Sequence, residues 1–431
     1  MFMTRTLAAV ALSLAAVSPT FAADPNPKSL AVPTDAAATA ADLVKHLADR
    51  DYHGREEATK ELRKLGRLAL PALLDAVATC NNAEVRLRCD ILLPAAQSAD
   101  IRARVDCFLA DTEGKYEHDL PGAKRFFAAV SRSDVAKQLF GDLLRSPNRD
   151  MLIAVDGPEA DLAQKFADRK TELKISPTGA FVSGPGGHPG SATNTDLAAL
   201  VFAEACLPDR GIGVGVAGRN MVLMNNYQFQ NSYRAAMDSD SRKEAFTAVL
   251  NHWMDTRTQP QSIYAAVNMA NRYTSPMALP AARKLASGKV AGGPGLYRGM
   301  AAAYVARFGT KDDLAVIEPM LEDKGVLTNM FLGGVGNKRQ VIQVRDLGLA
   351  MCLLMTKQEP ADYGITFRYK NNGTNDSLKY QYSAYHFEAE TEEKADEKRD
   401  AAVKKFKEWQ AAQKKDDKKE EKKDDKQPEK K

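Results

Sequence analysis

Apolar residues recur every three or four positions along much of the chain, a spacing typical of amphipathic helices. The clearest example lies in the first quarter of the sequence. Ala58, Leu62 and Leu65 fall on one helical face, and Gly66 is placed to end that helix with a left-handed residue. Pro71 suits the first turn of the next helix, where a backbone N–H has no partner within the helix. The pattern therefore predicts short helices that pack in pairs.

Capping residues predict where some of these helices begin. Thr34 or Asp35 is expected to cap a first helix over 36–48. Asn81, with Glu84 three residues later, matches a capping-box pattern and predicts the start of a third helix. These signals are local, so they predict helix starts without reference to the rest of the fold.

Proline, glycine and serine positions add further boundaries. Pro94 is expected to open another helix, because proline is tolerated in a first turn and disrupts a helix interior. Ser241 and Glu244 predict a capping box for a helix that ends near Arg257. The Gly- and Pro-rich segment 175–193 is expected to be an irregular loop. Other helices are predicted at 133–144, 158–173, 195–207, 262–273, 277–287, 299–308, 343–355 and 392–413.

Two apolar helices open with the same residue pair. The sequence LPALLDAV at 70–77, followed by Val85–Arg86 and an apolar helix, resembles the junction between two HEAT repeats, and Val344–Arg345 opens a similar helix later. The chain thus resembles exported bacterial HEAT-like helical-repeat proteins of unassigned function. This resemblance implies an all-α fold, a HEAT-like α-solenoid of stacked helix pairs with irregular central loops and a disordered C-terminal tail.

This interpretation divides the chain into seven segments. They are a signal peptide at 1–22, a flexible lead at 23–35, N-terminal HEAT-like repeats at 36–174, a central helical region with Gly/Pro-rich loops at 175–290, C-terminal HEAT-like helices at 291–358, an irregular segment with a capping helix at 359–413, and a disordered charged tail at 414–431. In the tail, residues four apart carry the same sign, which opposes helix formation.

The N-terminus has the order of a secretory signal. Arg5 is followed by the apolar run 7–17, and small residues end at Ala22. We therefore expect an exported protein, periplasmic or secreted after cleavage near Ala22. The apolar run is too short to remain as a membrane anchor, and no later segment approaches about 18 uninterrupted apolar residues. No stable membrane anchor is expected after cleavage.

Composition and charge narrow the classes of partner. Hydrophobic residues make up 44% of the chain and aromatic residues 7%, which favours close-packed helices. The formal net charge is +4, and much of it comes from the signal region and the tail. Without the signal region and the tail, the chain is nearly neutral. Nucleic-acid-binding proteins usually carry a concentrated positive charge, so no nucleic-acid partner is expected. Cys80 and Cys89 are close enough in sequence to pair if the compartment is oxidising, or they remain buried free thiols.

Three glycines match a nucleotide-binding pattern, but their context does not. Gly213, Gly215 and Gly218 have the GxGxxG spacing, whereas the residues before them predict a helix end and a turn instead of the required strand. An interhelical loop explains them better. His188, in the neighbouring Gly-rich segment, is kept as a remote binding candidate.

The sequence His53, Glu56, Glu57 is one residue short of a zinc motif. Glu57 stands where the HxxEH pattern needs a second histidine, so a charged helix start explains these residues without a metal. No catalytic, cofactor-binding or metal-binding residue is assigned, and no cofactor is expected.

The sequence favours a binding role over a chemical one. Stacked helix pairs make an extended concave surface suited to protein or peptide partners, so we expect a protein-binding or scaffolding surface. The alternative is an enzyme of unrecognised type with a site near the loops at 175–218. Among enzyme classes, a hydrolase is the one we favour.

Overall fold

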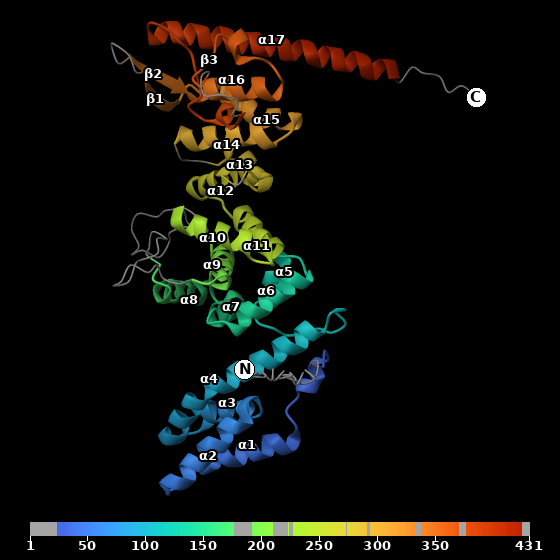
Figure 1. Ribbon diagram of the computed structural model, residues 1–431, viewed down its shortest axis with the longest axis vertical. Coiled ribbons are helices and arrows are strands. Elements are labelled where there is room, and N and C mark those ends of the chain that lie inside the picture. Colours follow the sequence, from blue (N-terminus) through green and yellow to red (C-terminus); the bar gives the residue numbers. More distant parts are fainter. Residues whose placement is uncertain are drawn as a thin grey trace, which may run out of the picture. The chain divides into compact units, whose positions relative to one another are not determined.

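The computed structural model describes residues 24–175, 192–209, 223, 227–272, 274–290, 294–332, 338–369 and 376–424. These residues are mostly helical, as the all-α prediction requires, with a few short strands (Figure 1). The chain folds as two compact units, Met1–Leu120 and Pro121–Lys431, here called the N-terminal unit and the C-terminal unit. The boundary between the two units falls within residues 36–174, the segment assigned above to N-terminal HEAT-like repeats.

In the N-terminal unit, the described residues from 24 onward form four α-helices and two short 3-10 helices. They are η1 (Pro27–Leu30), α1 (Thr34–His46), α2 (Tyr52–Leu65), η2 (Gly66–Ala69), α3 (Leu70–Thr79) and α4 (Ala83–Ala110). The predicted apolar faces form its core. Leu62, Leu73, Cys89 and Leu92 are all buried there. Helix α3 packs against α4, and α1 packs against α2.

The ends of these helices differ from the prediction in small ways. Helix α1 begins at Thr34, and no side chain caps it. Helix α4 is capped by Asn82 instead of Asn81, because the Asn82 side chain accepts hydrogen bonds from the amides of Glu84 and Val85. Gly66 does end α2 with a positive φ of 54°, but its ψ of −120° lies outside the left-handed helical region that was predicted. Local signals thus located the helices to within a few residues.

Pro94 does not begin a helix. It lies inside α4, which runs without a break from Ala83 to Ala110. Val85, Cys89, Leu92 and Ala96 are buried at spacings of four, three and four, so the same face stays in the core on both sides of the proline. A proline inside a helix costs about 3 kcal/mol. Packing of this continuous face offsets that cost.

The predicted flexible lead also forms structure. Residues 27–30 make the 3-10 helix η1, whose Asn26 cap accepts a hydrogen bond from the Lys28 amide. Nη1 of Arg67 donates to the Leu30 carbonyl oxygen at 2.8 Å. This contact joins the lead to η2 and holds it beside α4, which η1 also contacts.

The C-terminal unit contains the other helices and the strands of the described residues. Its elements are α5 (Ala123–Ala129), α6 (Asp134–Arg145), α7 (Arg149–Val155), α8 (Glu159–Glu172), α9 (Asn194–Cys206), α10 (Tyr227–Ser239), α11 (Lys243–Asp255), α12 (Pro260–Arg272), η4 (Pro276–Ala278), α13 (Leu279–Ala286), α14 (Gly295–Phe308), η5 (Lys311–Asp313), α15 (Leu314–Ile317), η6 (Glu318–Glu322), β1 (Val326–Leu332), β2 (Lys338–Gln343), α16 (Val344–Met355), η7 (Pro360–Tyr363), β3 (Thr366–Phe367), η8 (Asp376–Tyr380), β4 (Tyr385–His386) and α17 (Glu392–Asp424).

Helices of the C-terminal unit pack on helices that lie close to them in the chain. Helix α9 contacts α11, and α12, α13 and α14 contact one another, while α14 also contacts α16. Helix α9 is buried on all sides, since every residue from Asp196 to Ala205 is buried. The predicted capping box of Ser241 and Glu244 is not formed, because α11 begins at Lys243 and no side chain caps it.

The two short sheets were not predicted. Strands β1 and β2 form an antiparallel hairpin, and β3 pairs antiparallel with β4. The hairpin leads directly into α16, and the predicted start of this helix at Gln343 is correct. The Asp346 carboxylate accepts a hydrogen bond from the Gln343 amide at 2.9 Å.

Helix α17 is fixed to the start of α16 by buried arginines. Nε of Arg399 donates to Asp346 at 2.9 Å, and its Nη2 donates to the Val341 carbonyl at 2.7 Å. Arg345 reaches Asp396 and Asp400 of α17. The helix continues to Asp424, past the predicted start of the charged tail at residue 414. Lysine and glutamate are good helix formers, which favours this extension.

The two Val–Arg pairs are not equivalent in the structure. Val85 and Val344 are both buried, but Arg86 is exposed while Arg345 is 2% exposed and bonded to α17. The pair that suggested a repeat at both ends therefore has different surroundings in each. The five cysteines are free thiols, so Cys80 and Cys89 are not bridged.

Candidate functional site

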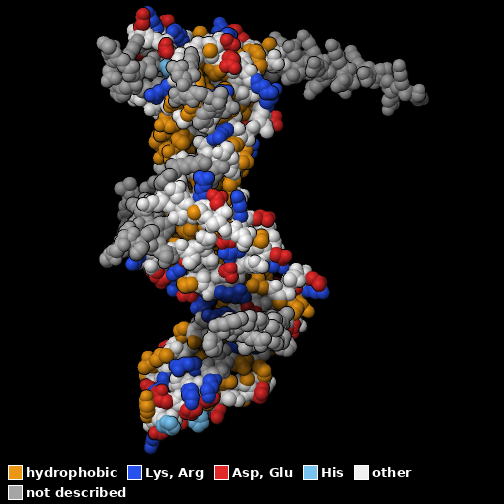
Figure 2. Space-filling model, in the orientation of Figure 1, with side chains coloured by type: hydrophobic (Ala, Val, Ile, Leu, Met, Phe, Trp, Pro, Cys, Tyr) orange, Lys and Arg blue, Asp and Glu red, His pale blue; other side chains and the backbone are white. Residues whose placement is uncertain are grey.

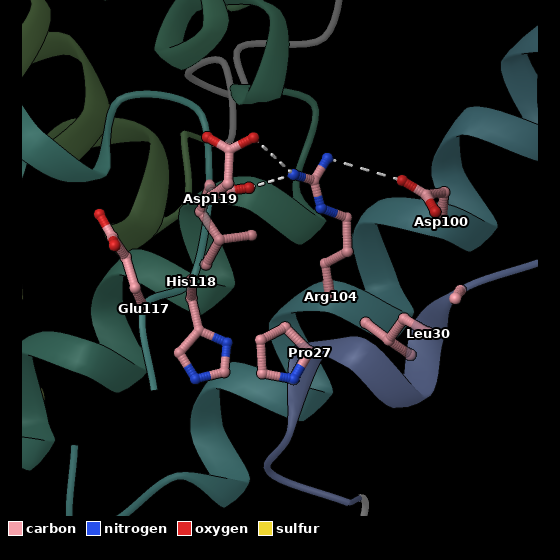
Figure 3. Close-up of a pocket in the computed structure, with 9 residues that line it drawn as sticks. Pro27, Leu30, Asp100, Arg104, Glu117, His118 and Asp119 are labelled. Carbon is pink, nitrogen blue, oxygen red and sulfur yellow. Dashed lines mark hydrogen bonds and ion pairs between the residues drawn. The ribbon is translucent and has the colours of Figure 1, made fainter. Parts of the chain in front are cut away.

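A cavity of about 410 Å³ in the N-terminal unit is the candidate functional site (Figure 3). Three elements form it, namely η1, the second half of α4, and the loop that follows α4. The residues that line it are Pro27, Leu30, Ala31, Asp100, Arg104, Glu117, His118, Asp119 and Leu120. All of them belong to one compact unit, so the site is complete within residues 27–120.

The loop after α4 is shaped by a buried carboxylate. Asp111 is 4% exposed and accepts hydrogen bonds from the Lys115 and Tyr116 amides, each at 2.9 Å. Gly114, with φ of 65°, makes the turn that brings these amides back to it. Burial alone would raise the pKa of Asp111, but the two amides and His118 outweigh burial and hold that pKa below its ordinary value.

His118 is oriented by the same carboxylate. Its Nε2 lies 3.1 Å from Oδ2 of Asp111, and its ring meets the edge of Phe108 at a centroid distance of 5.4 Å. A carboxylate only accepts hydrogen bonds, so this contact assigns the proton to Nε2. The contact with Asp111 therefore holds the His118 ring in one orientation in the wall of the cavity.

Arg104 connects two walls of the cavity. Figure 3 shows its guanidinium between Asp100 on the preceding turn of α4 and Asp119 on the loop. The distance from Arg104 Nη1 to Asp100 Oδ2 is 3.7 Å, and Nη2 lies 3.4 Å from Asp119 Oδ2 and donates to the Asp119 carbonyl. Arg104 thereby neutralises part of the acidic charge. Glu117 is exposed and adds further negative charge to the wall.

No family model, characterised protein or solved structure significantly matches this chain. We therefore infer the function from the residues that line the cavity. Acidic side chains and His118 line the cavity together with the apolar residues Pro27, Leu30 and Leu120. Such a surface favours a ligand that brings a positive charge or hydrogen-bond donors together with apolar groups.

The residues that resembled a zinc motif have other roles. His53 is exposed, Glu56 accepts from Nη1 of Arg88 at 2.8 Å, and Glu57 pairs with Lys60 at 3.3 Å. Within the described ranges, no cluster of three or more His, Cys, Asp or Glu side chains is arranged to hold a metal ion.

The other sequence candidates lie outside the described residues. These are His188 and the glycines at 213, 215 and 218, and the same holds for the predicted signal peptide at 1–22. Most of the loop region 175–218, proposed as the site of an alternative enzyme, is likewise not described, so that alternative stays a prediction. Among the described residues, no helix is both long and apolar enough to cross a bilayer.

A second polar centre is buried in the C-terminal unit next to that region. Glu204 of α9 accepts a hydrogen bond from the Leu223 amide at 2.8 Å and from Trp253 Nε1 at 2.7 Å. Arg257 packs over the Trp253 ring and donates to the Glu204 carbonyl oxygen at 3.1 Å. Burial raises the pKa of Glu204 to about 6, although Arg257 and the two hydrogen bonds lower it in part. This centre is enclosed, and we assign it to the core.

Sequence reasoning missed His118 because its partner is seven residues away in an irregular loop. The signal that was available is the segment after α4, where Asp111 ends the helix and Gly114 permits a turn. An aspartate at a helix end followed by glycine predicts a closed turn. It does not predict which later side chain will reach the carboxylate.

Proposed function

We propose that this protein is an exported binding protein whose N-terminal unit captures a peptide segment that carries basic and apolar side chains. The observation that carries this proposal is the lining of the cavity. Asp100, Glu117 and Asp119 supply three carboxylates against one guanidinium, and Leu30 and Leu120 supply apolar surface. A lysine or arginine beside a leucine-sized side chain is complementary to this lining.

The size of the cavity suits such a segment. Its volume of about 410 Å³ lies in the range of about 300–1,000 Å³ found for ligand pockets. The cavity is open at the surface, where Asp119 and Glu117 are exposed, so a longer chain can continue beyond it. We therefore expect a few residues of a peptide to enter while the remainder stays outside.

The C-terminal unit supports a binding role in a different way. We infer that α12, α13, α14 and α16 form a HEAT-like array, because α12, α13 and α14 contact one another and α14 contacts α16. Stacked helices of this kind present extended surfaces to protein partners. Export, expected from residues 1–22, would bring both surfaces to partners outside the cytoplasm.

Fluorescence anisotropy tests the peptide site directly. The probes are a fluorescein-labelled octapeptide of alternating leucine and arginine, and a matched octapeptide with glutamate in place of arginine. We expect the arginine peptide to bind and the glutamate peptide not to bind, with affinity falling as salt screens the acidic wall. Equal affinity for both peptides, or no binding of either, would overturn the proposal.

Two glutamates in the same loop provide a matched pair of variants. Glu117→Gln removes a carboxylate from the cavity wall and should weaken binding of the arginine peptide several-fold. Glu113→Gln is the control, since Glu113 pairs with Lys115 at 2.7 Å and does not line the cavity. If the two variants weaken binding equally, the charge of the loop as a whole attracts the peptide and the cavity is not its site.

A further inference from the structure

Helix α4 carries an apolar stripe on the side that faces away from the core. Leu87 is 56% exposed and Ile91, one turn later, is 62% exposed, while Pro94 continues the stripe after another turn. Figure 2 shows hydrophobic side chains along the edge of the N-terminal unit where α4 begins. Single exposed apolar residues are ordinary, but three at helical spacing form a continuous strip of the kind that helices bury against another helix.

Two opposite charges flank one side of this stripe. Arg86 and Asp90 are both exposed and lie on the same flank of α4, since they are four residues apart. Neither forms an ion pair within the described N-terminal unit. On the other flank, Arg88 is already engaged by Glu56 and Glu84. The unengaged charges are therefore confined to one edge of the stripe.

We propose that α4 pairs through this stripe with α4 of a second copy of the chain, in antiparallel orientation. A two-fold interface places the same patch of both copies in contact, so it must be complementary to itself. When two helices run antiparallel, the same flank of each faces its counterpart. Arg86 of one copy then lies against Asp90 of the other, and this contact occurs twice, while Leu87 and Ile91 of both copies are covered.

A single helix pair makes a weak dimer. It buries less than the roughly 1,200 Å² at the lower end of stable interfaces. We therefore expect dissociation constants between the micromolar and the millimolar range, measured by sedimentation equilibrium over a series of protein concentrations. The proposed contact between the two copies does not include the cavity beside η1 and the second half of α4. A negative result in the sedimentation experiment therefore leaves the peptide-binding proposal standing, and the reverse also holds.

Charge reversal provides a test with an internal control for folding. Arg86→Asp alone places two acidic residues against each other, and Asp90→Arg alone places two basic residues together, so each variant by itself should be at least about tenfold weaker in self-association. Mixing the two variants restores both contacts in a heterodimer, as does the double reversal Arg86→Asp/Asp90→Arg. Recovery in the mixture also shows that both variants are folded.

Two further variants separate the stripe from general effects of charge. Ile91→Glu should abolish the dimer, and the double reversal should not rescue it. Arg102→Asp is the matched control for Arg86→Asp, because Arg102 is an exposed arginine of α4 beyond the stripe. A wild-type chain that remains monomeric at millimolar concentration, a mixture that fails to associate, or an equal effect of Arg102→Asp would overturn the proposal.

Discussion

The buried carboxylate of Glu204 links the stability of the C-terminal unit to pH. Glu204 is enclosed between α9 and α11, and its two oxygens accept hydrogen bonds from Leu223 and Trp253. We consider Glu204→Gln, which removes the ionisable group and keeps nearly the same volume. The wild type and this variant should differ in how their free energy of unfolding changes with pH.

The size of that difference follows from the pKa. Burial raises the pKa of Glu204 from 4.5 to about 6. Because one pKa unit corresponds to about 1.4 kcal/mol, ionising Glu204 in the folded state costs about 2 kcal/mol more than in the unfolded state. The proton is bound more tightly in the folded chain. The corresponding stability is therefore complete below pH 4.5 and is lost as the pH rises through about 6.

A constant offset accompanies this change. Glutamine has one acceptor oxygen, whereas Glu204 serves two donors, so the variant leaves one of the two N–H groups without an acceptor. Protonated Glu204 has the same shortage, because its O–H oxygen is a poor acceptor, so the pH-independent offset between the two proteins is small. Asp346, whose pKa burial also raises to about 6, is present in both proteins and cancels in the comparison. The test is therefore how the difference in free energy of unfolding between the wild type and Glu204→Gln changes with pH. The absolute size of that difference does not test the pKa of Glu204.

Urea unfolding followed by tryptophan fluorescence measures it. Both tryptophans of the chain, Trp253 and Trp409, belong to the C-terminal unit, so the signal reports that unit. Between pH 4.5 and pH 7.5 the wild type should lose about 2 kcal/mol relative to Glu204→Gln. The control is Glu244→Gln, at an exposed position of α11. A difference that stays constant with pH, or one that changes in the opposite direction, would refute the reasoning.

Three further substitutions test individual contacts by chemical unfolding. Asn82→Ala removes the cap of α4 and should cost about 1 kcal/mol, whereas Asn81→Ala should cost little; equal costs would contradict the cap assignment. Gly122→Ala adds a Cβ 2.9 Å from the Leu152 carbonyl oxygen at a φ of 74°, so it should cost more than Gly114→Ala, whose Cβ meets open space. Leu73→Ala empties part of the N-terminal core and should cost about 2–5 kcal/mol; a loss below about 1 kcal/mol would mean that the core rearranges to fill the space.

Helices were predictable where their signals are local. The end of α2 at Gly66, the entry of α3 through Pro71 and the start of α16 at Gln343 each depend on residues within one turn of the boundary. Pro94 shows the limit of such signals. Its effect on the helix depends on the core contacts of residues on both sides, and those contacts are known only once α2 and α3 are in place.

The strands and the cavity depend on longer connections. The hairpin of β1 and β2 surrounds a glycine-rich segment, a pattern that favours a turn, but the helical periodicity of the flanking sequence hid it. The cavity brings η1 against residues about 75 to 90 positions later in the chain. Periodicity and capping describe one element at a time, so the meeting of Leu30, Arg104 and His118 could not be predicted from them.

The attachment of α17 has a consequence for how the chain reaches its folded state during synthesis. Arg345 and Asp346 are buried at the start of α16, and their partners Asp396, Arg399 and Asp400 follow about 50 residues later. A ribosome or an export channel delivers α16 first, with its charges still unmatched, and unpaired charges do not enter a core. The N-terminal unit is a compact unit within the first 120 residues, so we expect it to fold while the rest of the chain emerges. The C-terminal unit completes these buried contacts only when α17 has emerged, so we expect it to become resistant to proteases later than the N-terminal unit does.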